Sequence, residues 1–305
     1  MRYQKTYRYT SKLGRNETVT GILFVIPSLA MWLYWFLIPA IKSMRLSFYN
    51  NSSYINPASS YFVGFQNYIR LFQDTSFLTA VQHSFFLVTV ITATLTVLPF
   101  IIASLLHGNL RGRTFFRTSY YMPNVLSSIA ITTFFMYFFI KDGPGTKIFT
   151  LFGAENTTWF NNTQYAMTLV VLICVWASVG FYMILFIAGL QNIPKELYEA
   201  AMIDGANSIQ MIRYITIPLL KTTTYLVVTL NMINSFQIFD QIKAISKQSP
   251  LGSPAGSTST IVTFLYQHAF NYLDMGYGSA AAMMLFLIIF VLSLIRMMLT
   301  RSEDQ

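Results

Sequence analysis

The sequence contains a single cysteine and few charged residues. Of its 305 residues, 10% are charged and 54% are hydrophobic, whereas a soluble domain has about 25% charged residues. Cys174 cannot form a disulfide within the chain or a cysteine-based metal site. It lies inside an apolar run, where a small buried side chain is expected. The composition therefore indicates a membrane protein.

Motifs for nucleotide binding and catalysis are also missing. Neither the phosphate-binding pattern G-x-x-x-x-G-K-[ST] nor a nucleophile elbow occurs. His83, His107 and His268 lie far apart and do not show metal-ligand spacing. We therefore predict no catalytic residue, no metal ligand, no bound cofactor and no enzymatic activity. The net charge of +9 does not indicate nucleic acid binding, because Lys and Arg are scattered between apolar runs and suit a membrane surface.

Six runs are apolar and long enough to cross a membrane as helices, which takes about 20 residues. We predict an all-α membrane protein with one transmembrane domain at 18–300, a basic tail at 1–17 and a short tail at 301–305. The predicted spans are 18–41, 77–106, 118–140, 165–190, 222–242 and 275–298.

The distribution of Lys and Arg predicts the orientation, because cytoplasmic loops carry an excess of both. Thirteen of the 20 lie in four segments that six spans would place on one side: both tails and the loops after the second and fourth spans. The other three loops hold seven, including Lys42 and Arg45, which weaken the asymmetry. We therefore predict that both termini are cytoplasmic.

The loop between the fourth and fifth spans is polar and has helix signals. Pro194 suits the first turn of a helix, and Gly205 permits a turn with positive φ. Asn207 and Gln210 have the spacing of a capping box, which would open a second helix that bends or stops at Pro218. The local pattern predicts two short helices joined by a glycine turn.

This loop resembles the EAA motif of permease subunits of binding-protein-dependent ABC importers. The matching positions are Glu199, Ala200, Ala201, Asp204, Gly205, Ala206, Ile215 and Pro218. Ile217 stands where the motif has Leu, and Lys221 stands where a second Pro is frequent. The segment Phe62-Val63-Gly64-Phe65-Gln66-Asn67-Tyr68 is similar to a stretch after the first span of sugar permeases in this family.

The resemblance implies a type I ABC importer permease whose loop 192–221 couples it to an ATPase. The implied coupling residues are Glu199, Ala200, Ala201, Asp204 and Gly205. The implied partners are a second homologous permease, two ATPase subunits that carry ATP and magnesium, an extracellular or periplasmic sugar-binding protein, and the lipid of a bacterial inner membrane. Glu199 could instead support its helix through Lys195 at i, i+4.

The implied substrate is a sugar, in particular an oligosaccharide. A non-sugar solute such as a glycerol phosphate, a channel, and a non-transport scaffold or sensor are the alternatives. Polar and aromatic groups within spans are the candidates for the substrate pathway. They are Asn231, Asn234, Phe236, Gln237 and Asp240 in the fifth span, with Tyr182 and Tyr137. The three-residue spacing of Asn231, Asn234, Gln237 and Asp240 predicts one helical side, which could instead form hydrogen bonds between helices.

Overall fold

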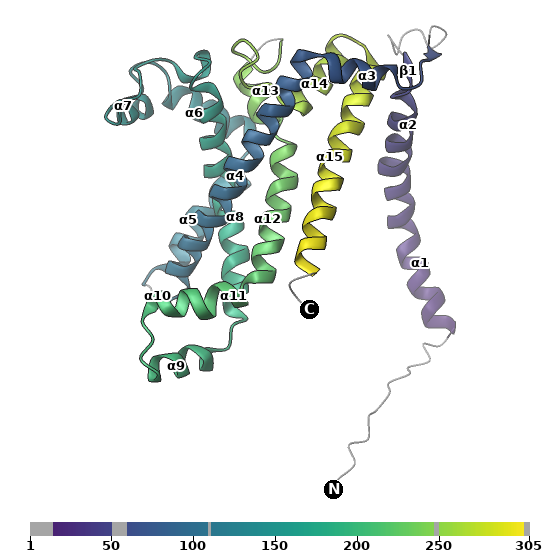
Figure 1. Cartoon of the computed structure of the whole chain (residues 1–305). Coiled ribbons are helices and arrows are strands. Elements are labelled where there is room, and N and C mark those ends of the chain that lie inside the picture. Colours follow the sequence, from purple (N-terminus) through teal and green to yellow (C-terminus); the bar gives the residue numbers. More distant parts are fainter. Residues whose placement is uncertain (1–14, 51–59, 109–110, 247–249, 302–305) are drawn as a thin grey trace.

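The computed structural model describes residues 15–50, 60–108, 111–246 and 250–301, and the described chain is mostly helical (Figure 1). In chain order the elements are α1 (Arg15–Trp32), η1 (Leu33–Leu37), α2 (Ile38–Leu46), β1 (Tyr49–Asn50), β2 (Tyr61–Phe62), α3 (Gln66–Gln73), α4 (Thr75–His107), α5 (Arg113–Val125), α6 (Ser128–Phe138), α7 (Pro144–Thr150), η3 (Trp159–Asn161), α8 (Ala166–Gln191), α9 (Lys195–Ile203), α10 (Ser208–Met211), η4 (Ile212–Thr216), α11 (Ile217–Leu219), α12 (Lys221–Phe236), α13 (Asp240–Ser246), α14 (Ile261–Tyr266), η5 (Gln267–Asn271) and α15 (Met275–Arg301). The two short strands pair antiparallel, with Tyr49 opposite Phe62.

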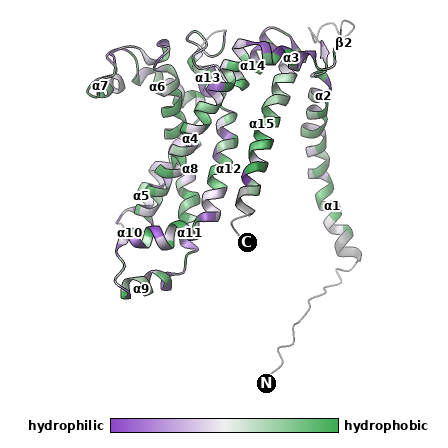
Figure 2. Cartoon of the chain, viewed as in Figure 1, coloured by the Kyte–Doolittle hydropathy of each residue, from purple (hydrophilic) through white to green (hydrophobic). Residues whose placement is uncertain are grey.

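Four helical segments are long and apolar enough to cross a membrane within the described part of the chain. They are Val19–Leu46, which joins α1, η1 and α2, and the helices Thr75–His107, Ala166–Gln191 and Met275–Met298. Figure 2 shows hydrophobic residues along their lengths and hydrophilic residues gathered towards the two ends of the bundle. These four segments correspond to the first, second, fourth and sixth predicted spans.

The other two predicted spans, 118–140 and 222–242, are not continuous helices. The first is divided into α5 and α6 by Leu126 and Ser127, whose backbones are extended. The second is divided because α12 ends at Phe236 and α13 begins at Asp240. A break exposes backbone N–H and C=O groups, which at membrane depth must be buried in protein or line a cavity.

The core of the bundle lies mainly between α4 and α8. Leu87 and Ile91 of α4 are buried in one apolar cluster with Ile173 and Met183 of α8. On another side of α8, Gly180 admits α5 closely, since a Cβ atom there would lie 2.0 Å from the carbonyl oxygen of Tyr120. The α4–α8–α5 packing holds the breaks in α5–α6 and α12–α13 in place.

The first long helix is an exception to this packing. Every side chain from Val19 to Lys42 is exposed within the described structure, and the segment contacts α15 through α2 near its far end. Figure 1 shows that α1 begins, and α15 ends, at the same end of the bundle as α9, α10 and α11. The described start of α1 and the described end of α15 thus lie at the end of the bundle that carries the loop 192–221.

Candidate functional site

A polar cavity of about 400 Å³ lies where the two interrupted helices meet α4 and α8. Its polar lining comes from α6, α8, α12, α13 and the connection between the last two. These residues are Ser128, Ser178, Tyr182, Asn231, Asn234, Ser235, Gln237, Asp240 and Gln241. Apolar side chains of α4, including Ile91 and Leu95, close one wall. The arrangement offers amides, hydroxyls and one carboxylate inside an otherwise apolar bundle.

Asn231 and Asn234 present amide groups to this cavity from α12. The Nδ2 atom of Asn234 donates to the Tyr182 hydroxyl across 3.3 Å, which joins α12 to α8. Asn231 is 1% exposed, and its Nδ2 atom is buried without a hydrogen-bond partner in the described structure. A buried amide N–H without a partner costs about 1–3 kcal/mol, so Asn231 is an unusual residue for the interior of α12.

All four members of the predicted polar stripe line the cavity, together with Tyr182. They do not lie on one helical side as predicted, because α12 ends at Phe236 and Gln237 and Asp240 follow the end of the helix. Gln237 and Asp240 reach the cavity because the helix is interrupted there, and not because of helical spacing. The hydrogen bond from Asn234 to Tyr182 shows that part of the stripe also links helices.

Phe236 and Tyr137 lie away from this cavity. Phe236 is 1% exposed and packs edge-on against Phe85 of α4, with ring centroids 5.4 Å apart. Tyr137 is 72% exposed on α6. Within one chain, these two predicted pathway residues are therefore a core residue and a surface residue.

Four polar cavity residues were missed in the sequence, one of which, Ser235, directly follows Asn234. Ser178 precedes Tyr182 by four positions on α8, so helical spacing could have indicated it. Gln241 directly follows Asp240 and could have been included with the stripe. Ser128 is the first residue of α6, and Pro123 in the last turn of α5 could have indicated the break before it.

The loop with the EAA-like motif contains the two predicted helices. Pro194 directly precedes α9, and Gly205 follows it with φ of +80°. The Gly205 N–H donates to the Met202 carbonyl (3.1 Å) and the Ala206 N–H donates to the Ala201 carbonyl (2.9 Å). This is a Schellman motif, in which a left-handed glycine satisfies the last carbonyls of a helix. The predicted glycine turn is confirmed.

The second helix opens with the predicted capping box. Gln210 N–H donates to Asn207 Oδ1 (2.9 Å), and Asn207 N–H donates to Gln210 Oε1 (2.8 Å). The helix continues past Pro218 and breaks at Leu220, two residues later than predicted. The π-helical turn η4 directly precedes α11, which contains Pro218. In a regular helix the Pro218 ring would clash with the carbonyl four positions earlier, and the wider turn accommodates it.

Glu199 and Ala200 are exposed on α9, Ala201 is half-buried, and Asp204 and Gly205 are exposed. Neither Lys195 nor Glu199 takes part in an ion pair in the described structure, so the alternative pairing of Glu199 with Lys195 does not form. One hydrogen bond, between the hydroxyls of Tyr198 and Thr216 (2.9 Å), ties α9 to η4. The carboxylate of Glu199 is therefore available to another molecule.

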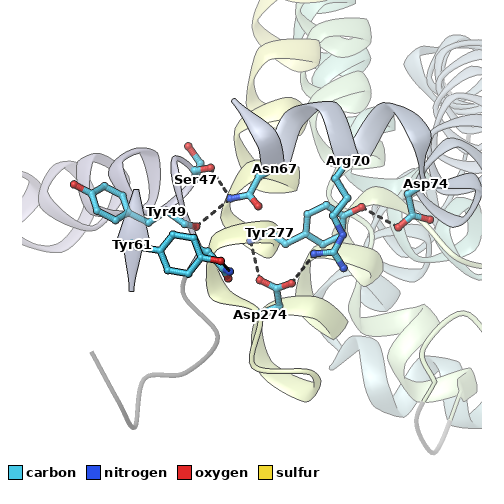
Figure 3. A network of polar contacts seen from close by, with 9 residues as sticks. Ser47, Tyr49, Tyr61, Asn67, Arg70, Asp74, Asp274 and Tyr277 are labelled. Carbon is cyan, nitrogen blue, oxygen red and sulfur yellow. Dashed lines mark hydrogen bonds and ion pairs between the residues drawn. The ribbon is translucent and has the colours of Figure 1, made fainter. Parts of the chain in front are cut away.

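The opposite end of the bundle carries a polar network that we call the α3–α15 network (Figure 3). It comprises Asn67, Arg70, Asp74, Asp274 and Tyr277. Arg70 and Asp274 form an ion pair of 2.9 Å, the Arg70 guanidinium lies over the Tyr277 ring, and the Tyr277 hydroxyl donates to Asp74 across 2.8 Å. Burial raises the pKa of the Asp74 carboxyl, but hydrogen bonds from Tyr277 and the Ser76 and Phe77 amides outweigh it, and the pKa is lowered overall.

The same network explains the Gly64 to Tyr68 segment. Asn67 Nδ2 donates to the backbone carbonyls of Ser47 (2.9 Å) and Tyr49 (3.0 Å), and the Tyr68 hydroxyl bonds that of Ser47 (2.7 Å). Gly64 has φ of +57°, which turns the chain into α3. In this chain the segment fastens α3 to the end of α2.

Comparison with known proteins agrees with this architecture. Residues 96–304 match the family described as binding-protein-dependent transport system inner membrane component. The chain is 34% identical over 290 residues to the arabinooligosaccharides transport system permease protein AraP of Bacillus subtilis (strain 168), covering 94% of this chain and 90% of that protein. It is 30% identical over 297 residues to the lactose transport system permease protein LacF of Rhizobium radiobacter, covering 96% and 98%.

The fold is shared with a chain of a bacterial alginate ABC transporter, solved in complex with an alginate pentasaccharide-bound periplasmic protein. The TM-score is 0.81 at 18% identity, covering 96% of this chain and 97% of that chain. The helices and the polar cavity thus define a multi-pass membrane protein of the ABC importer permease fold. The chain belongs to the family of binding-protein-dependent transport system inner membrane components.

Proposed function

We propose that this chain forms half of a membrane pathway for a sugar, in particular an oligosaccharide. The observation that carries the proposal is the polar cavity at the breaks of two helices inside an apolar bundle. Amides and hydroxyls there match the hydroxyl groups of a sugar, and interrupted helices at mid-membrane are a recurrent way to build transport sites. The names of AraP and LacF, which are carbohydrate transport permeases, support this substrate class.

The lining disfavours the alternative of a glycerol phosphate. Asp240 is the one charged residue among the cavity residues of the described structure, and Lys, Arg and His are absent from that lining. A carboxylate repels an anionic solute in an apolar surrounding. A cavity of this size also favours a transport subunit over a scaffold or sensor.

The remaining parts of the proposal concern topology and assembly. We infer six crossings, with α5–α6 and α12–α13 each forming one interrupted crossing, and with both termini and the loop 192–221 in the cytoplasm. The exposed Glu199, with Ala200, Ala201, Asp204 and Gly205, would dock on one of two ATPase subunits, which bind ATP and magnesium. A second permease and an extracellular or periplasmic binding protein complete the importer. The transmembrane permease domain is proposed to span residues 18–300.

The test is uptake of oligosaccharide by the assembled transporter carrying Asn234→Ala or Gln237→Ala. Loss of one amide–hydroxyl hydrogen bond, about 0.5–1.5 kcal/mol, should raise the KM for uptake by about two- to tenfold, with assembly and basal ATP hydrolysis retained. Gln164→Ala is the control, because this amide side chain is exposed and lies outside the cavity. Uptake that is unchanged in both cavity variants would contradict the proposal.

A further inference from the structure

A second cavity, of about 460 Å³, lies at the α9–α11 end of the bundle, away from the central one. It is bounded by the end of α4, the first turns of α5, the end of α8 and the start of α9. Its ionisable side chains are His107, Arg113, Arg117 and Lys195. Leu190 and Ile193 supply an apolar wall. Four nitrogen-bearing groups from α4, α5 and α9 thus converge on one space.

No carboxylate of the described residues offsets these charges. Asp and Glu are absent from the lining, and neither Arg113, Arg117 nor Lys195 takes part in the ion pair that the described structure contains. The nearest acids along the chain, Glu196 and Glu199, are exposed on α9. Like charges held together without a counter-charge indicate a site for an anion.

Arg117 gives the most direct sign of a missing partner. Its Nε atom is buried and has no hydrogen-bond partner in the described structure. An unpaired guanidinium N–H that is removed from water is costly, and Arg commonly satisfies such groups with carboxylate or phosphate oxygens. Arg117 therefore combines a place in the cavity lining with an unpaired N–H group.

The surroundings favour a phosphate that is carried by lipid. The cavity lies where α4 and α8, two of the membrane-length helices, come to an end. Leu105 on α4 and Phe115 and Phe116 on α5 are exposed beside it in sequence, and side chains of this kind suit acyl chains. Basic pockets between membrane helices on the cytoplasmic side are known to hold anionic head groups.

We propose that this cavity binds a phosphate group, held by Arg117, Arg113 and Lys195, with His107 as a further donor. The phosphate belongs either to the head group of an anionic phospholipid or to free phosphate. Because the site joins α4, α5 and α8 to the first turn of α9, its occupant bridges the bundle and the loop 192–221. The proposal concerns residues outside the central cavity and stands independently of the transported substrate.

The test uses the purified full chain, delipidated and returned to mixed micelles with phosphatidylglycerol or phosphatidylcholine, with retained lipid measured by native mass spectrometry. Wild-type protein should retain phosphatidylglycerol in preference to phosphatidylcholine. Arg117→Gln and Arg113→Gln should each weaken this retention by about tenfold or more, as expected for the loss of a charged hydrogen bond. Arg111→Gln is the matched control, since Arg111 is exposed at the same end but does not line the cavity.

A second arm distinguishes the source of the phosphate. If phosphatidylglycerol is not retained, but millimolar inorganic phosphate raises the Tm of wild type and Arg111→Gln and not of Arg117→Gln, free phosphate is the ligand and the site stands. Equal retention by Arg111→Gln and Arg117→Gln would overturn the proposal. So would an absence of both lipid and phosphate binding by the wild-type chain.

Discussion

At the scale of single residues, a glycine is favoured at position 205 by the backbone conformation and not by close packing. Its φ of +80° lies in the left-handed region, yet a Cβ atom there would have no other atom within 4 Å. The cost of a side chain is therefore conformational, about 1–2 kcal/mol for an ordinary L-residue, and smaller for Asn. Space for the side chain is not the limit.

We expect Gly205→Val to disrupt the turn between α9 and α10 and abolish uptake, whereas Gly205→Asn should keep most of it. Both variants should insert normally, because the apolar helices are unchanged. Membrane level, ATPase retention and uptake should be measured for the two variants in parallel. Equal uptake by Val and Asn variants would show that positive φ at this position is unimportant.

The stability that Asp74 contributes depends on pH. Its pKa is lowered from the usual 3.8, since the hydrogen bonds that it accepts from Tyr277 and two backbone amides outweigh burial. A lowered carboxyl pKa contributes stability that is present above 3.8 and is lost as pH falls through the lowered value. The α3–α15 network should therefore weaken only in strong acid.

Tyr277→Phe should reduce stability by about 1–3 kcal/mol, because the charged Asp74 loses a hydrogen bond, and should move the acid-induced loss to higher pH. Both effects would be measured by thermal melting of the detergent-solubilised chain at pH values from neutral to about 3. This range includes the ordinary carboxyl pKa. Tyr137→Phe serves as the control, since that ring is exposed on α6 and lies outside the network. An unchanged acid midpoint in Tyr277→Phe would refute this role for the hydrogen bond.

At the scale of elements, the contact of α5 with α8 depends on Gly180. A Cβ atom there would overlap the backbone of Tyr120 and Tyr121, which cannot move without the whole of α5. Gly180→Ala should therefore destabilise the chain by about 1–3 kcal/mol, as overpacking generally does.

The matched variant is Gly21→Ala, where the helical backbone is free of neighbours within 4 Å. Replacement of an unhindered helical Gly should leave stability unchanged or raise it by up to about 1 kcal/mol. Melting temperatures of the two variants against wild type would decide. If Gly180→Ala melts at the same temperature as wild type, the close approach of α5 and α8 is not required for stability.

The sequence was sufficient for the long helices and for the α9–α10 turn, because both depend on local signals: apolar length, a left-handed Gly and a capping box. It was insufficient for the two breaks. Leu126 and Ser127 carry no strong helix-breaking chemistry, and Gln237–Phe239 contain neither Pro nor Gly. Both breaks lie beside the cavity, but only Pro123, in the last turn of α5, gave a local sign of one of them.

At the scale of the whole molecule, the positions of the helix ends agree with a single membrane orientation. The start of α1, the end of α15 and the helices α9–α11 adjoin one end of the bundle, and the α3–α15 network lies at the other. The excess of Lys and Arg in the sequence segments of the first end is the reason for the proposal that this end faces the cytoplasm.

Reporter fusions would test this orientation in cells. A fusion after Gln305 should report the cytoplasm, and a fusion in the loop near Gly153 should report the opposite side. A second cytoplasmic fusion, placed beside Gly205, acts as the internal standard. A cytoplasmic signal from the Gly153 fusion would reverse the proposed topology of the α6–α8 region.

The exposed first helix has a consequence for how its sequence can vary. From Val19 to Lys42 no side chain is buried by the described remainder of the chain. Alone in lipid, such a helix is constrained by hydropathy and length and not by shape, so apolar substitutions of any size should be interchangeable there. Positions at which uptake by the assembled transporter nevertheless differs between Leu, Phe and Ala would be positions that contact a neighbouring subunit. A saturation library over this one helix would thus map a contact surface that belongs to another chain.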